Sequence, residues 1–136
     1  MLPATGQYSI VVDPGEGATG DAELLLTSAT EQQGTAIGVD GPAVKATIAQ
    51  AGAIASFTFD GTAGQKVYLE VRSSSLPDEC GVLKLHAPDN LVIAGGCIIA
   101  GGGSIDGTVL PATGQYSIVV DPGEDATGDA ELLLHT

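Results

Sequence analysis

Short stretches in which apolar and polar residues alternate recur along the chain. The clearest are Ala43–Gln50, Ala53–Gly61 and Gln65–Ser73, which are separated by the turn-forming sequences QAG and DGTAGQ. A period of two residues places successive side chains on opposite faces, as in a half-buried β-strand. Gly81–Gly96 has the same character on both sides of Pro88-Asp89, and we expect a β-hairpin around that turn.

Two more strands are expected near the C-terminus, in GQYSIVVDP and DAELLLHT, paired through the turn sequence GEDATG. The glycine-rich run Ala94–Gly107 has neither the lysine nor the strand–loop–helix context of a phosphate-binding loop, so we expect a flexible surface connection. About eight short strands, frequent turns and no helical period predict an all-β fold, namely an antiparallel, jelly-roll-like β-sandwich.

A long internal repeat is the most specific feature of the sequence. Leu2–Leu26 returns at Leu110–Leu134 with every position unchanged except one, where Gly17 corresponds to Asp125. Both copies begin with LPATG, the pentapeptide that sortases recognise on proteins destined for the cell wall. The part of the chain after the second pentapeptide contains no Lys or Arg and no spanning segment, so we interpret LPATG as the approach to a strand.

The spacing between the copies indicates how the chain is organised. The period, which runs from Leu2 to Leu110, is too long for a solenoid and fits tandem globular domains. We therefore expect residues 1–27 to be the C-terminal β-hairpin of a preceding repeat, duplicating residues 109–135, and residues 28–136 to form one complete module. On this interpretation Met1 begins a fragment whose native targeting segment is missing. A designed or circularly permuted chain is the alternative explanation.

The surplus copy is a candidate for self-association. As an unpaired hairpin it would expose strand edges with the apolar residues Ile10, Val12, Leu24 and Leu26. We expect it to dock on an edge of its own module or on that of a neighbouring molecule. The second arrangement is head-to-tail and propagates as a fibre when its rotation does not close.

Charge narrows the range of partners. Seventeen acidic residues against four basic ones give a net charge of −13, which disfavours nucleic acid and anionic membranes. No apolar run approaches the roughly 20 residues of a transmembrane helix, so membrane insertion is not expected.

Two cysteines, Cys80 and Cys97, flank the Pro88-Asp89 turn at equal distances. A two-residue turn there would place them opposite each other on neighbouring strands, close enough for a disulfide bond. The alternatives are two free buried thiols or, with less support from the spacing, a metal site. A disulfide bond predicts an oxidising compartment, hence a secreted or cell-surface protein.

Several sequences together resemble the bacterial pre-peptidase C-terminal domain family and related tandem modules of secreted proteins: ASFTFDGTAGQKVYLEV, CGVLKLHAPDN, LPATGQYSIVVDP and ATGDAELLL. The similarity covers most of Ala43–Leu134 and is most specific in FDGTAGQ and LPATGQYSIVVDP. The resemblance implies a β-sandwich appended to extracellular proteases or repeated along surface proteins. It further implies a non-catalytic accessory or spacer role, in some members with polysaccharide, protein or calcium binding.

Candidate chemistry is sparse. His86 and His135 belong to no recognisable nucleophile motif, so we expect no enzymatic activity. The acidic sequence DPGEDATGDAE contains four weak candidates for calcium ligands, Asp121, Glu124, Asp125 and Asp129. The other interpretation of this sequence is a solvated acidic turn.

The expected function follows from these features. We expect a non-catalytic structural or spacer module of a secreted or cell-surface tandem-repeat protein, with other copies of itself as partners and no cofactor. The alternative is a polysaccharide- or protein-binding accessory module, either with or without calcium dependence. An exposed aromatic cluster formed by Tyr8, Tyr68 and Tyr116 would favour this alternative.

Overall fold

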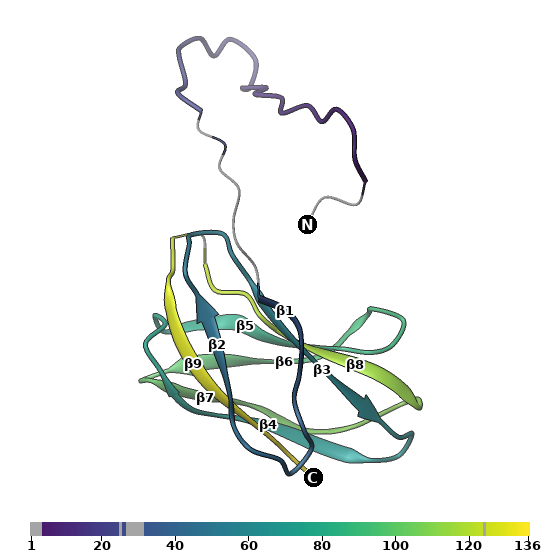
Figure 1. Cartoon of the computed structure of the whole chain (residues 1–136). Helices are drawn as coiled ribbons and strands as arrows, with labels where there is room; N and C mark the ends of the chain where they lie inside the picture. Colours follow the sequence, from purple (N-terminus) through teal and green to yellow (C-terminus); the bar gives the residue numbers. More distant parts are fainter. Residues whose placement is uncertain (1–3, 25, 27–31, 124) are drawn as a thin grey trace.

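The computed structural model describes residues 4–24, 26, 32–123 and 125–136, with only the backbone described at residues 32 and 33. These residues contain no helix and form nine strands (Figure 1). The strands are β1 (Gln32–Ala36), β2 (Val44–Ile48), β3 (Ala55–Gly61), β4 (Lys66–Ser74), β5 (Glu79–His86), β6 (Val92–Ile99), β7 (Gly102–Val109), β8 (Gly114–Val120) and β9 (Gly128–His135). The all-β prediction is confirmed.

All nine strands belong to one continuous sheet in the order β1-β3-β8-β5-β6-β7-β4-β9-β2. Its neighbours are antiparallel except β1 and β3, which run parallel. The sheet curls over itself, so that the half containing β3, β8 and β5 faces the half containing β4, β9 and β2, as in a sandwich (Figure 1). The sequence predicted a purely antiparallel sandwich because a short first strand that joins the sheet in parallel leaves no separate signal in the residue pattern.

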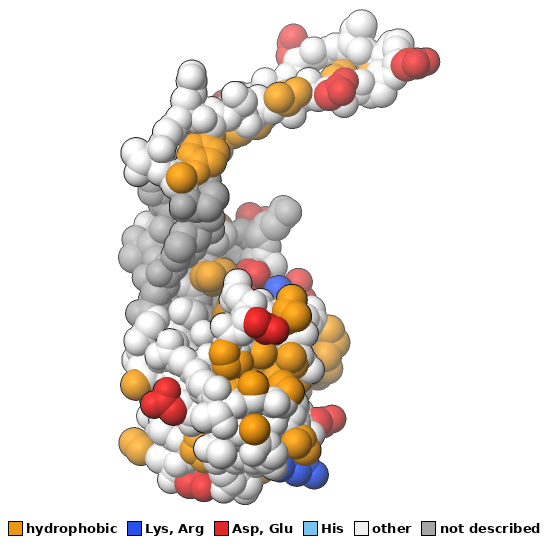
Figure 2. All heavy atoms as spheres, turned by 90° about the vertical axis from the view of Figure 1, so that its right-hand side faces the viewer, with side chains coloured by type: hydrophobic (Ala, Val, Ile, Leu, Met, Phe, Trp, Pro, Cys, Tyr) orange, Lys and Arg blue, Asp and Glu red, His pale blue; other side chains and the backbone are white. Residues whose placement is uncertain are grey.

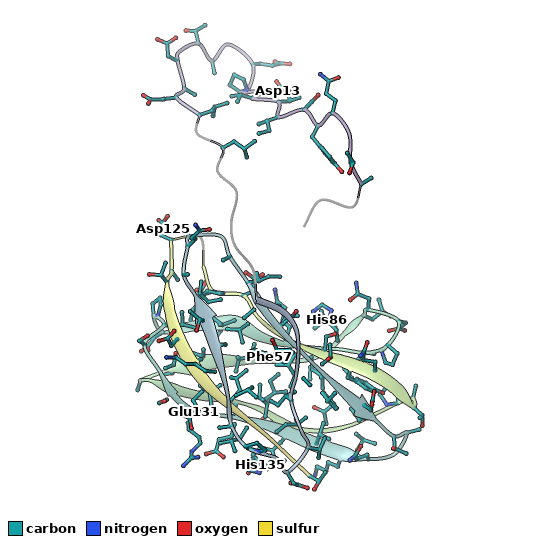
Figure 3. All side chains as sticks on the ribbon, in the orientation of Figure 1. Asp13, Phe57, His86, Asp125, Glu131 and His135 are labelled. Carbon is teal, nitrogen blue, oxygen red and sulfur yellow. A yellow bond between two sulfur atoms is a disulfide. The ribbon has the colours of Figure 1, made fainter. Side chains whose placement is uncertain are left out.

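The core fills the space between the two halves. Along β3 and over most of β4, β8 and β9 every second side chain is buried, which is the period expected of half-buried strands. Aliphatic residues dominate this core, and its largest fully buried side chains are Tyr116 and Phe57. Phe57 lies at the centre of the domain in Figure 3. Every buried core residue of the described chain lies between Ile37 and Leu134, so this core belongs entirely to the predicted module.

The predicted C-terminal hairpin is not present. β8 pairs with β3 and β5, whereas β9 pairs with β4 and β2, so the two strands lie in opposite halves of the sheet. The connection between them crosses from one half to the other. The sequence suggested a hairpin because the two strands follow each other closely, but strand periodicity does not reveal whether such strands pair or face each other.

The glycine-rich run is also different from the prediction. Instead of a flexible connection, it contains most of β6 and β7, which pair with each other. A Cβ atom at Gly96 would overlap the carbonyl oxygen of Ser104, and one at Gly103 would overlap that of Cys97. Glycine is therefore required there by the close approach of two strand backbones, rather than for flexibility.

The duplicated N-terminal segment, residues 4–24, forms no strand and stands apart from the sandwich (Figure 1). We refer to it as the N-terminal arm. Its side chains are exposed throughout. The sequence of β8 and β9 therefore becomes strands only where β3, β5, β4 and β2 are available as neighbours.

Candidate functional site

The predicted disulfide bond joins Cys80 on β5 to Cys97 on β6. The two cysteines are opposite each other in the register of the hairpin, as predicted, but the turn is longer than two residues. Ala87–Leu91 connects the strands, and Asn90 has a positive φ of 69°. Register shifts, one of them beside Gly81 with φ of 82°, bring the two cysteines back into opposition.

The acidic β8–β9 connection does not gather its carboxylates around one point. Asp121 Oδ2 lies 3.5 Å from Lys84 Nζ, and Asp129 Oδ2 lies 3.2 Å from Lys45 Nζ. Asp125 is exposed at the tip of the connection (Figure 3), and Glu124 lies outside the described residues. Among the residues that the structure describes, no group of three or more His, Cys, Asp or Glu side chains could hold a metal ion. Calcium binding therefore stays a prediction.

These ion pairs belong to a pattern that the sequence did not reveal. The third pair joins Arg72 Nη1 to Glu131 Oε1 at 3.6 Å. Three of the chain's four Lys and Arg residues thus contact carboxylates of the second repeat copy, from β2, β4 and β5. The partners of each pair are far apart in the sequence, so no local pattern could identify them.

The three tyrosines do not form the exposed aromatic cluster that would favour a sugar-binding platform. Tyr116 is fully buried and stacks on Phe59, with ring centroids 5.5 Å apart. Tyr68 is partly exposed and stacks on His135 at 4.8 Å, while Tyr8 lies in the N-terminal arm. The arrangement that would favour the polysaccharide-binding alternative is therefore not formed by these three tyrosines.

Each histidine takes part in a structural contact. His86 Nδ1 lies 3.2 Å from the carbonyl oxygen of Asn90 in the turn between β5 and β6. His135 Nε2 lies 3.0 Å from Glu70 Oε2 across the β4–β9 pair. His86 and His135 lie at different ends of the domain in Figure 3, so the structure does not bring the two together.

The last residue of the chain is attached to the loop after β1. The backbone N–H and the side-chain hydroxyl of Thr136 both donate hydrogen bonds to the carboxylate of Asp40. These bonds, the side-chain one first, lower the pKa of Asp40 below its usual value of 3.8. They close the end of the sandwich at which Val39 also forms a bridge to Leu134.

The predicted assembly residues are exposed, and their role in assembly stays a prediction. Ile10 is 66% exposed, Val12 58%, Leu24 64% and Leu26 82%. Figure 2 shows hydrophobic and acidic side chains along the arm, and it shows no lysine or arginine there. Ile, Val and Leu are among the residue types that are most often fully buried in folded proteins.

One element of local structure is already formed in the arm. The hydroxyl of Tyr8 donates to the carbonyl oxygen of Ala4 at 2.6 Å and accepts from its N–H at 3.1 Å. In the folded module, Tyr116 makes the same two bonds to Ala112 at the same two distances. The turn that leads into β8 therefore forms from local sequence alone, without the sheet.

A shallow groove of about 510 Å³ lies on the outer surface of β3, β5, β6 and β8. Its apolar lining comes from Ile54, Val92 and Val119, and its polar lining includes Lys84 and His86.

Within the described part of the chain, no helix has the length and apolar character needed to span a membrane.

Comparison with known proteins supports the fold. No family model matches the chain, and no curated protein matches its sequence. Among solved structures, the pre-peptidase C-terminal domain of a collagenase from Bacillus anthracis is similar, with a TM-score of 0.54 and 15% sequence identity. The similarity covers 76% of this chain and 95% of that domain. PliG, a periplasmic inhibitor of g-type lysozyme from Aeromonas hydrophila, has a TM-score of 0.49 and 19% identity over 77% of this chain and 99% of its own.

The first similarity confirms the architecture that the sequence resemblance implied. The chain has the fold of a pre-peptidase C-terminal domain. At 15% identity the similarity concerns the fold and not the activity.

Proposed function

We propose that this chain is a non-catalytic structural module of a secreted or cell-surface protein built from tandem repeats. The observation that supports this most directly is the fate of the two repeat copies. One copy supplies β8 and β9 in the interior of the sheet, and the other lies outside a sandwich that is complete without it. Residues 1–27 then complete the preceding repeat, and residues 28–136 form the next one.

Location outside the cytoplasm is supported by the Cys80–Cys97 bond. Cys80 is exposed, so the bond is accessible to the thiol–disulfide balance of its surroundings. Disulfide bonds of this kind persist in oxidising compartments and are rare where thiols are kept reduced. The acidic surface suits a soluble extracellular module.

The second part of the proposal is that the chain self-associates head to tail through the N-terminal arm. Exposed apolar residues in the arm supply the attractive surface, and the duplicated sequence supplies its specificity. A head-to-tail contact engages one surface of each molecule with a different surface of the next and can propagate.

The experiment compares the whole chain with residues 28–136. If residues 1–27 belong to another repeat, the shorter chain keeps the melting temperature of the whole chain, since the core lies entirely within it. Light scattering of the concentrated whole chain should show a minor population of oligomers that the shorter chain does not form. A shorter chain that does not fold would refute the repeat boundary, and equal oligomer sizes would refute the self-association.

A second candidate function is a protein-binding module that uses the groove on β3, β5, β6 and β8. The observation in its favour is the combination of apolar and charged lining in that groove. Calcium dependence belongs to this candidate through Asp121, Glu124, Asp125 and Asp129. A melting temperature that is equal in excess calcium and in chelator would exclude the calcium-dependent form.

A further inference from the structure

The N-terminal arm and Leu26 together repeat every side chain that the sandwich buries in β8 and β9. In the module these are Tyr116, Ile118, Val120, Ala130, Leu132 and Leu134, each at most 2% exposed. The corresponding residues of the arm and Leu26 have the same identities and are exposed. The position where the two copies differ, Gly17 against Asp125, lies in an exposed turn.

The ion pairs that hold the second copy can be reproduced by the first. Asp121, Asp129 and Glu131 contact Lys84, Lys45 and Arg72. Asp13, Asp21 and Glu23 occupy the corresponding positions of the arm. Most of the chain's basic residues therefore lie along the site that receives this sequence, which gives the site electrostatic selectivity for it in an otherwise acidic molecule.

The arm is also partly organised for the same position. Its Tyr8–Ala4 turn has the geometry of the Tyr116–Ala112 turn that precedes β8 in the sheet. A segment that already holds the bound conformation loses less conformational entropy when it docks.

Chain length decides which molecule receives the arm. In an occupied site the residue equivalent to Leu26 is Leu134, which lies beside Val39. Gln32 pairs with Ala55 on β3. The chain from Gln32 to Val39 is largely extended, so these two residues lie about 20 Å apart. The link from Leu26 to Gln32 reaches about 20 Å only when it is fully extended. Filling its own site would require this link to be fully extended, whereas a second molecule imposes no such condition.

We propose that the arm of one molecule occupies the β8–β9 position of a second copy, replacing the resident strands in register. This inference rests on the proposed self-association and specifies the site that the arm recognises. Exchange between two intact molecules breaks and forms the same contacts, so it is nearly neutral in free energy and populates few oligomers. Any weakening of the resident copy shifts the balance toward the arm.

The test places a charge in the buried face of the resident copy of the whole chain. Ile118→Asp should displace β8, and the intact arm of another molecule should then restore the sheet. We expect Ile118→Asp to keep β-sheet circular dichroism and to form oligomers by light scattering. The matched double variant Ile10→Asp/Ile118→Asp has no intact copy and should unfold. Ile10→Asp alone should remain a folded monomer.

Loss of the sheet in Ile118→Asp to the same extent as in the double variant would overturn the proposal. A folded monomer would also overturn it, because the arm would then be filling its own module. If Ile118→Asp is tolerated in the double variant as well, Leu132→Asp with its counterpart Leu24→Asp repeats the test on β9.

A cross-link checks the register independently. Thr58 on β3 is opposite Ser117 on β8, and Ser9 is the counterpart of Ser117 in the arm. In the Ile118→Asp background, molecules with Ser9→Cys mixed with molecules with Thr58→Cys should form a disulfide-linked dimer on a non-reducing gel. A Gly15→Cys partner, whose cysteine lies in the turn of the arm, should not. Equal cross-linking by both would overturn the register. Failure of these tests with residues 28–136 still folding would refute this inference alone and leave the repeat boundary intact.

Discussion

A comparison of Tyr116 with Tyr8 shows which structural features depend on local sequence and which depend on the surrounding sheet. Both hydroxyls make the same two bonds to the backbone four residues earlier. Tyr116 is fully buried against Phe59, whereas Tyr8 is 48% exposed. The turn is thus a property of the PATGQY sequence, and the burial is a property of the sheet.

Replacing each tyrosine by phenylalanine should have unequal effects. Tyr116→Phe removes a donor and an acceptor at the start of β8 and should lower the free energy of unfolding by about 1 kcal/mol, the usual net value of a hydrogen bond. Tyr8→Phe is the matched control and should leave the free energy of unfolding unchanged, because the arm lies outside the folded core. Urea unfolding of the two variants measures both. Equal losses would show that the arm contributes to the folded module.

Asp40 gives the end of the sandwich a defined dependence on pH. Hydrogen bonds from Thr136 lower the pKa of Asp40 in the folded state below 3.8. A depressed carboxyl pKa stabilises the fold above the unfolded pKa, and that stability is lost as pH falls through the folded pKa. Asp40→Asn should therefore melt at a lower temperature than the parent at about pH 6, and the difference should narrow as the pH falls below 3.8. A difference that does not change with pH would exclude the carboxylate as its source.

At the scale of elements, the sequence predicts strands well where apolar and polar side chains alternate. It predicts them poorly where glycines interrupt this alternation. Ala53–Gly61 and Gln65–Ser73 were placed within two residues of β3 and β4. β7 was missed because Gly102, Gly103 and Gly107 offer no side chains to alternate. Local periodicity also does not specify which strands become neighbours, so β8 and β9 were paired incorrectly.

The candidate site likewise has features that the sequence predicts and others that only the folded sheet reveals. The Cys80–Cys97 pair was predicted correctly from symmetry about Pro88-Asp89, although the real connection is longer and a bulge compensates for it. The exposure of the arm's apolar residues followed from the duplication. The lysine partners of Asp121 and Asp129 could not be predicted, because only the folded sheet brings them together.

The β6–β7 pair is the link through which the two halves of the sheet are joined, and it depends on glycine. Gly103→Ala would place a Cβ atom against the Cys97 carbonyl, which is backbone and cannot rotate away. We expect a loss of at least about 2 kcal/mol in the free energy of unfolding, in the range of other overpacked sites. Gly38→Ala is the control, since its Cβ would meet nothing closer than 3.6 Å. Thermal unfolding of the two variants should differ clearly; similar melting temperatures would mean that the strands can move apart at little cost.

At the scale of the whole molecule, charge opposes association while the repeat favours it. Residues 1–27 contain four acidic residues and no basic ones, and residues 28–136 contain thirteen acidic residues against four basic ones. An arm that approaches another module therefore meets net repulsion over most of its path. The attraction is local and comes from Lys45, Arg72 and Lys84, which already form surface ion pairs.

The salt dependence of assembly distinguishes the long-range repulsion between molecules from the local attraction of the ion pairs. Surface ion pairs contribute about 0–1 kcal/mol each. Each molecule carries a net charge of −13 before the added aspartate, so we expect the repulsion between molecules to dominate. Raising the ionic strength from about 0.01 M to about 0.1 M shortens the screening length from about 30 Å to about 10 Å, which weakens the long-range repulsion first. The Ile118→Asp chain should therefore form more oligomer at the higher ionic strength, as measured by light scattering at constant protein concentration. Weaker association at high salt would instead assign the binding energy mainly to the contacts with Lys45, Arg72 and Lys84. Substituting these residues by glutamine would then reduce assembly more than substituting the apolar positions of the arm that become buried when it docks.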